Sequence, residues 1–251
     1  MKLSAEEKMM YKVMKALYDC GIPVNFKGSM VLKACLMEAG FTEDTRHTVD
    51  IDGNWYSETA PTGDQMEKSL QRALDQNDIP LDVKIYRMYG EKRSAGFELN
   101  DKSTGEPIFT MDIDVNRPDV PTQMYEIEGV RFRGVSPRQM IADKVSVISK
   151  DKVFRRIKDV VDMYYISRVF EFNTDDVIRT LEESGRELGD FDGFLKRIDD
   201  LKHSYDKFRF SGDVYKPPFE TIYESVKEYV KPELLSFYTK AYVGTATSIM
   251  V

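Results

Sequence analysis

The sequence predicts an α+β fold, with a mixed sheet and helices in the first half and a helical second half. Segments with the alternating apolar pattern of strands are interspersed with helix-spaced apolar residues up to about residue 134. Beyond that point the apolar residues recur almost entirely at helical spacing. Ser136, Pro137 and Gln139 are residue types that begin helices at these relative positions. We therefore predict an α/β domain over 1–135 and a helical domain over 136–251.

The helices of the first domain have clear start signals. Ser4 and Glu7 have the spacing of a capping box, and so do Thr62 and Gln65, so a helix is expected to begin at each pair. A further helix is expected over 30–39, ended by Gly40. Strands are expected at 24–27, 48–55, 83–89, 95–100, 108–115 and 125–132. In the second domain, after the helix that starts at 136, helices are expected near 152–169, 175–184, 191–201 and 219–240, the last interrupted at Pro232.

The composition places the chain among globular proteins that work in the cytoplasm. Of its 251 residues, 41% are hydrophobic and 31% charged, which argues against disorder. A net charge of −7 argues against a protein that coats nucleic acid, although a local basic groove is compatible with it. No apolar run suits a signal peptide or a membrane span, so no membrane partner is expected. Cys20 and Cys35 form no metal-binding motif, which fits a reducing compartment.

A Gly-Ser turn and a pair of aspartates suggest chemistry. Gly28 and Ser29 lie between an expected strand and helix, where free backbone N–H groups suit a phosphate. Asp50 and Asp52 are two apart in a strand, so they point to one face with Cα atoms roughly 7 Å apart. Two such carboxylates suit Mg²⁺. Alone, the aspartates are more often a solvated strand face; the Gly-Ser turn about twenty residues earlier makes a metal and phosphate site the more specific interpretation.

The strand expected at 108–115 offers a third carboxylate. Its apolar residues alternate, so Asp112 and Asp114 share the opposite face. Either aspartate could complete a metal-binding triad if this strand lies beside the one that carries Asp50 and Asp52. The alternative is the polar face of an amphipathic strand, and periodicity does not separate the two.

The second domain contains a lysine on an apolar helix stripe. Lys144 falls between Ile141 and Ile148 at helical spacing. Such a lysine either extends to the rim of the apolar surface or points into a cleft, where its charge could neutralise nucleotide phosphates.

The next expected helix carries charges on one face. Arg155, Asp159 and Asp162 are spaced at i, i+4 and i+7. They form either a solvated Arg–Asp pair, worth a few tenths of a kcal/mol, or a wall of the same active site.

Four motifs resemble the AbiEii/AbiGii abortive-infection toxin family of nucleotidyltransferases. They are FKGSMVL at 26–32, RHTVDID at 46–52, ADK at 142–144 and RRIKDVVD at 155–162. They occur in the order of the family, and the resemblance covers roughly residues 5–170. It implies a DNA polymerase β-like nucleotidyltransferase fold in which the helical domain completes the active-site cleft. It also implies transfer of a nucleotide from an NTP with Mg²⁺ or Mn²⁺.

The resemblance implies a role for each matching residue. Bound triphosphate would be held by Gly28, Ser29 and Arg46, and the metal would be ligated by Asp50 and Asp52 with Asp114, preferred to Asp112, as the third acid. Lys144 would contact the nucleotide and take part in catalysis with Asp159, supported by Asp162.

The resemblance also implies a toxin whose acceptor is RNA, such as a tRNA end, with a cognate antitoxin that need not contact it. Two alternatives stay open. The same fold supports nucleotide transfer to a small molecule or a protein hydroxyl, and it also supports NTP binding without turnover.

Overall fold

The structure is a computed structural model that describes residues 1–89, 94–115, 119–210, 214–233 and 235. The chain forms two compact units, Met1–Pro137 and Arg138–Val251. The division lies two residues beyond the predicted domain boundary.

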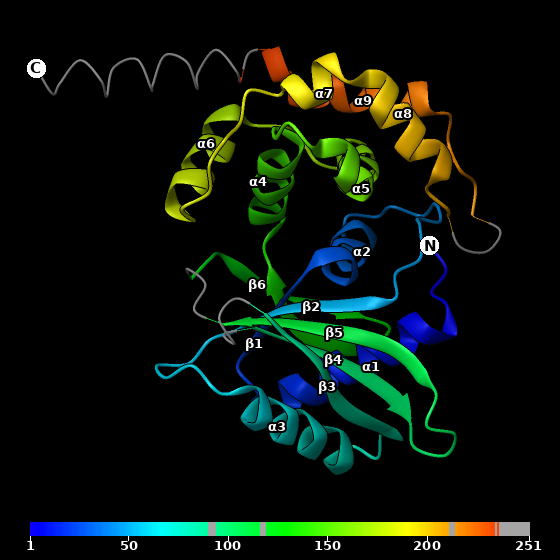
Figure 1. The fold of residues 1–251 in the computed structure, drawn as a ribbon, viewed down its shortest axis with the longest axis vertical. Helices are drawn as coiled ribbons and strands as arrows, with labels where there is room; N and C mark the ends of the chain where they lie inside the picture. Colours follow the sequence, from blue (N-terminus) through cyan, green and yellow to red (C-terminus); the bar gives the residue numbers. More distant parts are fainter. Residues whose placement is uncertain (90–93, 116–118, 211–213, 234, 236–251) are drawn as a thin grey trace, which may run out of the picture. The chain divides into compact units, whose positions relative to one another are not determined.

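Unit 1 is built on a seven-stranded mixed sheet (Figure 1). Its strands are β1 (Val24–Lys27), β2 (Asp50–Trp55), β3 (Leu81–Tyr89), β4 (Ser94–Asp101), β5 (Pro107–Val115), β6 (Thr122–Ile127) and β7 (Val130–Val135). They lie in the order β3-β4-β5-β2-β1-β7-β6. The pairs β2–β5 and β1–β7 are parallel and the others are antiparallel. The two strands that carry aspartate pairs, β2 and β5, are therefore neighbours.

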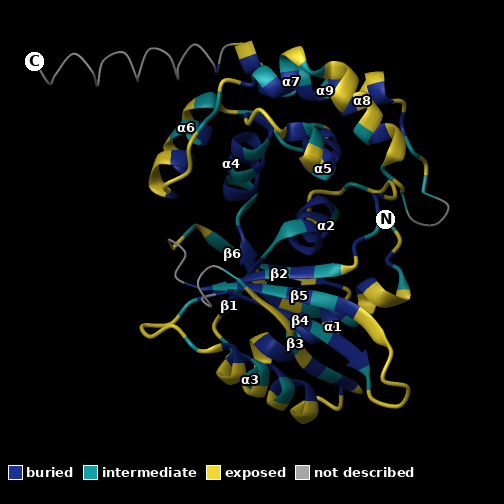
Figure 2. Ribbon diagram, in the orientation of Figure 1, coloured by how far each residue is buried: buried dark blue, intermediate teal, exposed yellow. Residues whose placement is uncertain are grey.

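Helices α1 (Ala5–Asp19), α2 (Gly28–Glu38) and α3 (Gly63–Gln76) pack against this sheet (Figure 1). α1 and α2 contact each other on one face of it, where the hydroxyl of Tyr11 on α1 donates to the carbonyl of Met30 on α2 at 2.8 Å. Both predicted capping boxes are confirmed at the starts of α1 and α3. The core lies between the sheet and these helices, whose facing sides are buried (Figure 2). There, Tyr11 of α1 and Phe26 of β1 both contact the ring of Phe132. Asp52 pairs with Lys27, the neighbour of Phe26, so the polar residues of β2 and β5 lie on the face opposite to this core.

The strand predicted over 125–132 is wrong, because this segment is a hairpin. β6 and β7 pair antiparallel, and Glu128 and Gly129 between them both have positive φ, at 48° and 78°. Two positive φ angles are typical of a two-residue hairpin turn that matches the twist of the strands. The continuous run of alternating residues masked the turn, for which Gly129 was the available signal.

Unit 2 is helical, as predicted. Its elements are α4 (Pro137–Ile148), which begins at the last residue of unit 1, then η1 (Val153–Arg156), α5 (Ile157–Ser167), α6 (Thr174–Glu183), α7 (Asp192–Lys196), α8 (Ile198–Lys207) and α9 (Phe219–Val230). α9 packs on α5, and Phe194 of α7 stacks on Tyr223 of α9. Among the described residues, no helix is long and apolar enough to cross a membrane.

Three helix predictions in unit 2 need correction. The helix expected near 152–169 is a short 3-10 turn, η1, followed by α5. The one expected over 191–201 is two helices, because the backbone leaves the helical conformation at Arg197. The last helix is interrupted at Lys231, one residue before the predicted position, because Lys231 takes a left-handed conformation with φ of 51°. Pro232, Glu233 and Leu235 are helical again. Residues 234 and 236–240 of that prediction lie outside the described residues.

Candidate functional site

The Gly28-Ser29 turn lies against the strand that carries the aspartate pair. Gly28 is the first residue of α2 and has a φ of +74°. A β-carbon at this position would collide with Oδ2 of Asp52. The strand register explains the contact, because Lys27 at the end of β1 is the Cα partner of Asp52 on β2. The predicted phosphate-binding turn and one predicted metal ligand are therefore in direct contact.

Side chains from the loop before β2 orient both halves of this site. Arg46 donates from Nη2 to Oγ of Ser29 at 2.6 Å, and both residues are buried. Thr48 donates from Oγ1 to Oδ1 of Asp50 at 2.5 Å. The loop that leads into β2 thus positions the hydroxyl next to Gly28 and the first carboxylate of the pair.

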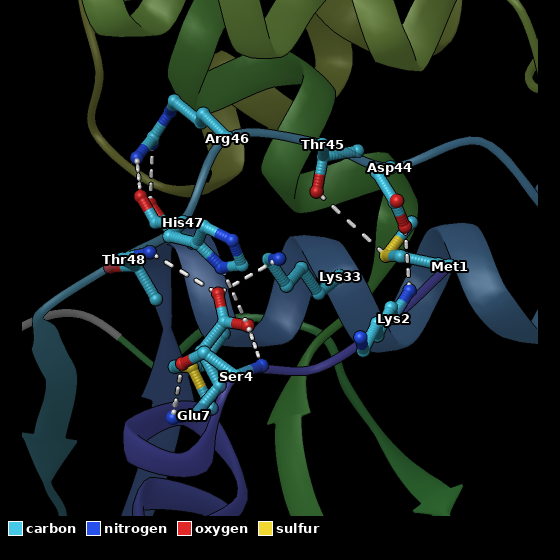
Figure 3. A network of polar contacts seen from close by, with 12 residues as sticks. Met1, Lys2, Ser4, Glu7, Lys33, Asp44, Thr45, Arg46, His47 and Thr48 are labelled. Atoms are coloured by element: carbon cyan, nitrogen blue, oxygen red, sulfur yellow. Dashed lines mark hydrogen bonds and ion pairs between the residues drawn. The ribbon is translucent and has the colours of Figure 1, made fainter. Parts of the chain in front are cut away.

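A buried carboxylate holds this loop in place (Figure 3). Glu7 of α1 has no solvent exposure and forms an ion pair with Lys33 of α2 at 2.8 Å. It accepts a hydrogen bond from the backbone N–H of Thr48 at 3.2 Å, and Nδ1 of His47 lies 3.1 Å from its second oxygen. Burial would raise the pKa of Glu7, but Lys33 and the hydrogen bond from Ser4 outweigh it and lower the pKa.

The register between β2 and β5 distinguishes the two third-acid candidates. Asp112 is the Cα partner of Asp52, whereas Asp114 is the partner of Asn54, two pairs further along. Both are in ion pairs: Asp112 with Arg87 at 2.6 Å, and Asp114 with Lys27 at 2.7 Å.

The charge of these carboxylates acts on a neighbouring tyrosine. Burial, together with Asp112 and Asp114, raises the pKa of Tyr89. Within the part of the chain that the structure describes, no three His, Cys, Asp or Glu side chains are grouped closely enough to hold a metal ion by themselves.

Unit 2 contains a buried charge cluster built from the later motifs. Nζ of Lys144 on α4 lies 3.0 Å from Oδ1 of Asp159 and 2.8 Å from Oδ2 of Asp162, both on α5. All three side chains are less than a tenth exposed. The predicted pair of Arg155 with Asp159 is wrong, because Arg155 lies in η1. Nε of Arg156 contacts Asp159 instead, at 2.9 Å. Because the helix is broken between η1 and α5, the arginine that lies beside Asp159 is one residue later than a continuous helix predicts.

Three functional candidates escaped the sequence analysis. Lys27 precedes the Gly-Ser turn and also donates to Asn54 at 2.8 Å. Glu7 and Arg87 contact site residues from distant parts of the sequence. Lys33 offered a signal for Glu7, since a charged residue in the otherwise apolar α2 needs a buried partner.

Comparison with known proteins identifies the family. The family described as Nucleotidyl transferase AbiEii toxin, Type IV TA system, matches residues 16–225. No curated protein sequence matches the chain.

Two solved structures are similar to this one. MenT4, a nucleotidyltransferase toxin from Mycobacterium tuberculosis H37Rv, has 14% identity and a TM-score of 0.56, over 89% of this chain and 81% of that chain. An antigenic nucleotidyltransferase-like protein from Paracoccidioides brasiliensis has 14% identity over 85% of this chain and 98% of that chain, with a TM-score of 0.48. The likeness to MenT4 is one of fold and confirms the predicted nucleotidyltransferase fold. Because the family match spans most of the chain and both units, this protein belongs to the AbiEii family of nucleotidyl transferase toxins of type IV toxin–antitoxin systems.

Proposed function

We propose that this protein transfers a nucleotide from an NTP to a hydroxyl of RNA, such as a tRNA end, in a Mg²⁺-dependent reaction that slows growth. The observation that supports it most directly is the contact between Gly28 and the carboxylate of Asp52. In that arrangement a triphosphate held by the N-terminal turn of α2 lies beside carboxylates that bind magnesium. The family supports the transferase and toxin roles, and the RNA acceptor is the substrate class that the motif resemblance implies.

The residues present fit a magnesium ion. Asp50 and Asp52 share a strand face and offer oxygen ligands, and the missing side chain of Gly28 leaves room beside Asp52. Magnesium retains positions for water and for substrate phosphates, so two carboxylates suffice from the protein. When bound, the ion would supply Lewis-acid activation and neutralise charge on the phosphates.

The reaction is an in-line displacement at the α-phosphorus. The acceptor oxygen forms a bond to that phosphorus, the bond to the bridging oxygen of pyrophosphate breaks, and the hydroxyl proton passes to water. Ser29, held by Arg46, would donate to the triphosphate together with the backbone N–H groups of the turn. Lys144 and Asp159, which belong to the later motifs, would act in nucleotide binding and catalysis. Asp162 would support them.

Labelled nucleotides test this proposal. The purified protein would be incubated with Mg²⁺, each α-labelled NTP in turn and separate RNA, protein and small-molecule fractions, with Asp52→Asn as the inactive control. We expect label in RNA with the wild type and a loss of at least about a hundredfold, ~2.7 kcal/mol, in the variant. Label confined to protein or small molecules would reject the RNA acceptor. Mg²⁺-dependent NTP binding without transfer to any fraction would reject the proposal that the protein is an enzyme.

Expression in cells tests the toxin role. Expression without a cognate antitoxin should slow growth, and Asp50→Ala should relieve it. An equally toxic Asp50→Ala variant would contradict the proposal that toxicity comes from nucleotide transfer.

The third acid can be assigned with a matched pair of variants. Asp112→Asn and Asp114→Asn each remove one charge from the same face of β5. Because Asp112 is the strand partner of Asp52, we propose that Asp112→Asn raises the Mg²⁺ concentration needed for half-maximal activity more than Asp114→Asn does. The reverse order would assign the role to Asp114, the residue preferred on sequence grounds.

A further inference from the structure

The polar face of the sheet carries one continuous row of residues across five strands. Lys27 pairs with Asp52, Asp52 with Asp112, Asp112 with Gly96 on β4, and Gly96 with Arg87 on β3. Cα partners share a sheet face, so the row runs from the candidate active site to the edge strand β3. Gly96 interrupts the side chains of the row. Arg87 therefore reaches across the glycine to Asp112, at 2.6 Å.

A bulge brings an aromatic ring onto the same face. The pairing of β3 with β4 shifts between Ile85 and Arg87, which leaves Tyr86 as the extra residue. A bulge of this kind turns consecutive side chains to one side of a sheet. A β-carbon at Gly96 would lie 2.7 Å from the Tyr86 ring and 2.8 Å from Cγ of Arg87. Both side chains consequently cover the space that Gly96 leaves open.

Tyr86 and Arg87 form one contiguous, exposed surface. The guanidinium of Arg87 lies 5.0 Å from the centre of the Tyr86 ring and 5.2 Å from that of Tyr89. The ion pair with Asp112 holds the arginine in this position. Tyr86 is nevertheless 41% exposed. The bulge and the charge of Arg87 protect this edge strand against pairing with another chain. Edge protection does not require an aromatic ring at residue 86, and the exposed part of that ring is open to a ligand.

We propose that Tyr86 and Arg87 bind a nucleobase by stacking, an inference that rests on the proposed function for its choice of ligand. Aromatic rings stacked with arginine are the common way for proteins to hold bases in single strands without reading their sequence. Gly96, which Tyr86 and Arg87 cover, is two strands from Asp52, roughly 10 Å across the sheet, a distance that one nucleotide can span. The base belongs either to the NTP or to the terminal nucleotides of the acceptor RNA, and the chemistry of stacking is the same for both.

Substitutions at Tyr86 test stacking. Tyr86→Phe keeps the ring, Tyr86→Trp enlarges it, and Tyr86→Ala removes it. The matched control is Tyr18→Ala, which removes a similarly exposed tyrosine from α1 on the other side of the sheet. Binding of an NTP would be measured by calorimetry, and binding of a short, labelled single-stranded RNA by fluorescence anisotropy. In Tyr86→Trp, quenching of the new indole reports stacking directly, because the chain has one other tryptophan, Trp55, which is nearly buried.

We expect Tyr86→Ala to weaken one of the two ligands roughly tenfold, with Tyr86→Phe and Tyr18→Ala close to the wild type. Weaker NTP binding assigns the base to the NTP, and weaker RNA binding assigns it to the acceptor. Unchanged binding of both in Tyr86→Ala, or no quenching in Tyr86→Trp, overturns the inference. Equal losses in Tyr86→Phe and Tyr86→Ala also overturn it, because they would indicate a contact through the hydroxyl.

These binding measurements need no turnover, so the two proposals can fail separately. Nucleotide transfer with unchanged KM values in Tyr86→Ala, together with unchanged binding, would remove this inference and leave the proposed function. If the wild type transfers no nucleotide and Tyr86→Ala still weakens base binding, the proposed function is rejected and the stacking site remains.

Discussion

Gly28 lies so close to Asp52 that a β-carbon on the glycine would overlap a carboxylate oxygen of the aspartate. The contact joins the N-terminus of α2 to the middle of β2, at positions 28 and 52 of the sequence. This contact leaves no room for a side chain at residue 28, and the φ of +74° is a second, independent reason for glycine there.

The first prediction separates these two reasons. Gly28→Ala should reduce nucleotide transfer at least about a hundredfold, ~2.7 kcal/mol, because the new methyl group displaces the Asp52 carboxylate. Gly21→Ala is the matched control: its φ is +66° but its β-carbon would meet nothing within 4 Å. Both variants should lose about 1–2 kcal/mol of folding stability from the left-handed backbone. Activity and urea denaturation would be measured on both. Equal activity in the two variants would contradict the contact.

The second prediction concerns the bond between Arg46 and Ser29. Arg46→Lys and Ser29→Ala should each raise the KM for NTP roughly tenfold, the equivalent of one charged hydrogen bond. The double variant should be little worse than either single one, because both remove the same bond. Arg72→Lys, on the exposed side of α3, controls for the loss of a guanidinium. Effects that multiply in the double variant would show that the two residues act independently.

The third prediction concerns the charge cluster of unit 2. Lys144→Met leaves two buried carboxylates, Asp159 and Asp162, without the lysine between them. We expect a loss of about 3–5 kcal/mol in stability, measured as a fall in Tm. Adding Asp162→Asn should restore part of it, because one buried charge is removed. Lys152→Met, at an exposed position, should leave Tm unchanged. A further fall on adding Asp162→Asn would contradict the electrostatic explanation.

The fourth prediction is a pH dependence set by Glu7. Its pKa is lowered in the folded state, because Lys33 and the hydrogen bonds outweigh the effect of burial. The ionised carboxylate therefore stabilises the fold fully above its unfolded pKa of about 4.3 and loses this contribution as the pH falls through the folded value.

Urea denaturation from pH 7 to pH 3 measures this contribution. Glu7→Gln should be less stable than the wild type at pH 7 by about 3–5 kcal/mol, and the gap should narrow below about pH 4.3. The exposed Glu106→Gln should show no such gap. A gap that is constant over the whole range would argue against ionisation as the cause.

The fifth prediction distinguishes the two thiols. Cys35 is 2% exposed, and burial raises its pKa to about 11, despite a contact with the hydroxyl of Tyr125 at 3.7 Å. Cys20, at the end of α1, is partly exposed. A disulfide-exchange reagent at neutral pH should react quickly with one thiol and slowly with the other. Cys20→Ser should abolish the fast phase and Cys35→Ser should retain it; the opposite pattern would refute the burial of Cys35.

Local chemistry determined much of this protein from the sequence alone. The capping boxes at Ser4 and Thr62 place two helix starts, because such hydrogen bonds form within four residues. The two-residue period of a strand places Asp50 beside Asp52, and Asp112 beside Asp114, on one face. Helical spacing likewise placed Lys144 on a buried stripe, and the order of the motifs led to the family.

Tertiary structure decided whatever depends on partners that are distant in the sequence. The parallel register of β2 and β5 sets Asp112, rather than Asp114, beside Asp52, and no local pattern contains that register. Simple alternation along β3 would place Tyr86 and Arg87 on opposite faces, and the bulge opposite Gly96 brings them together. Arg46 reaches Ser29, and Gly28 reaches Asp52, because packing of α2 and β1 against β2 selects these contacts. The residue types of the site are thus a local property of the chain, whereas their distances are set by long-range pairing.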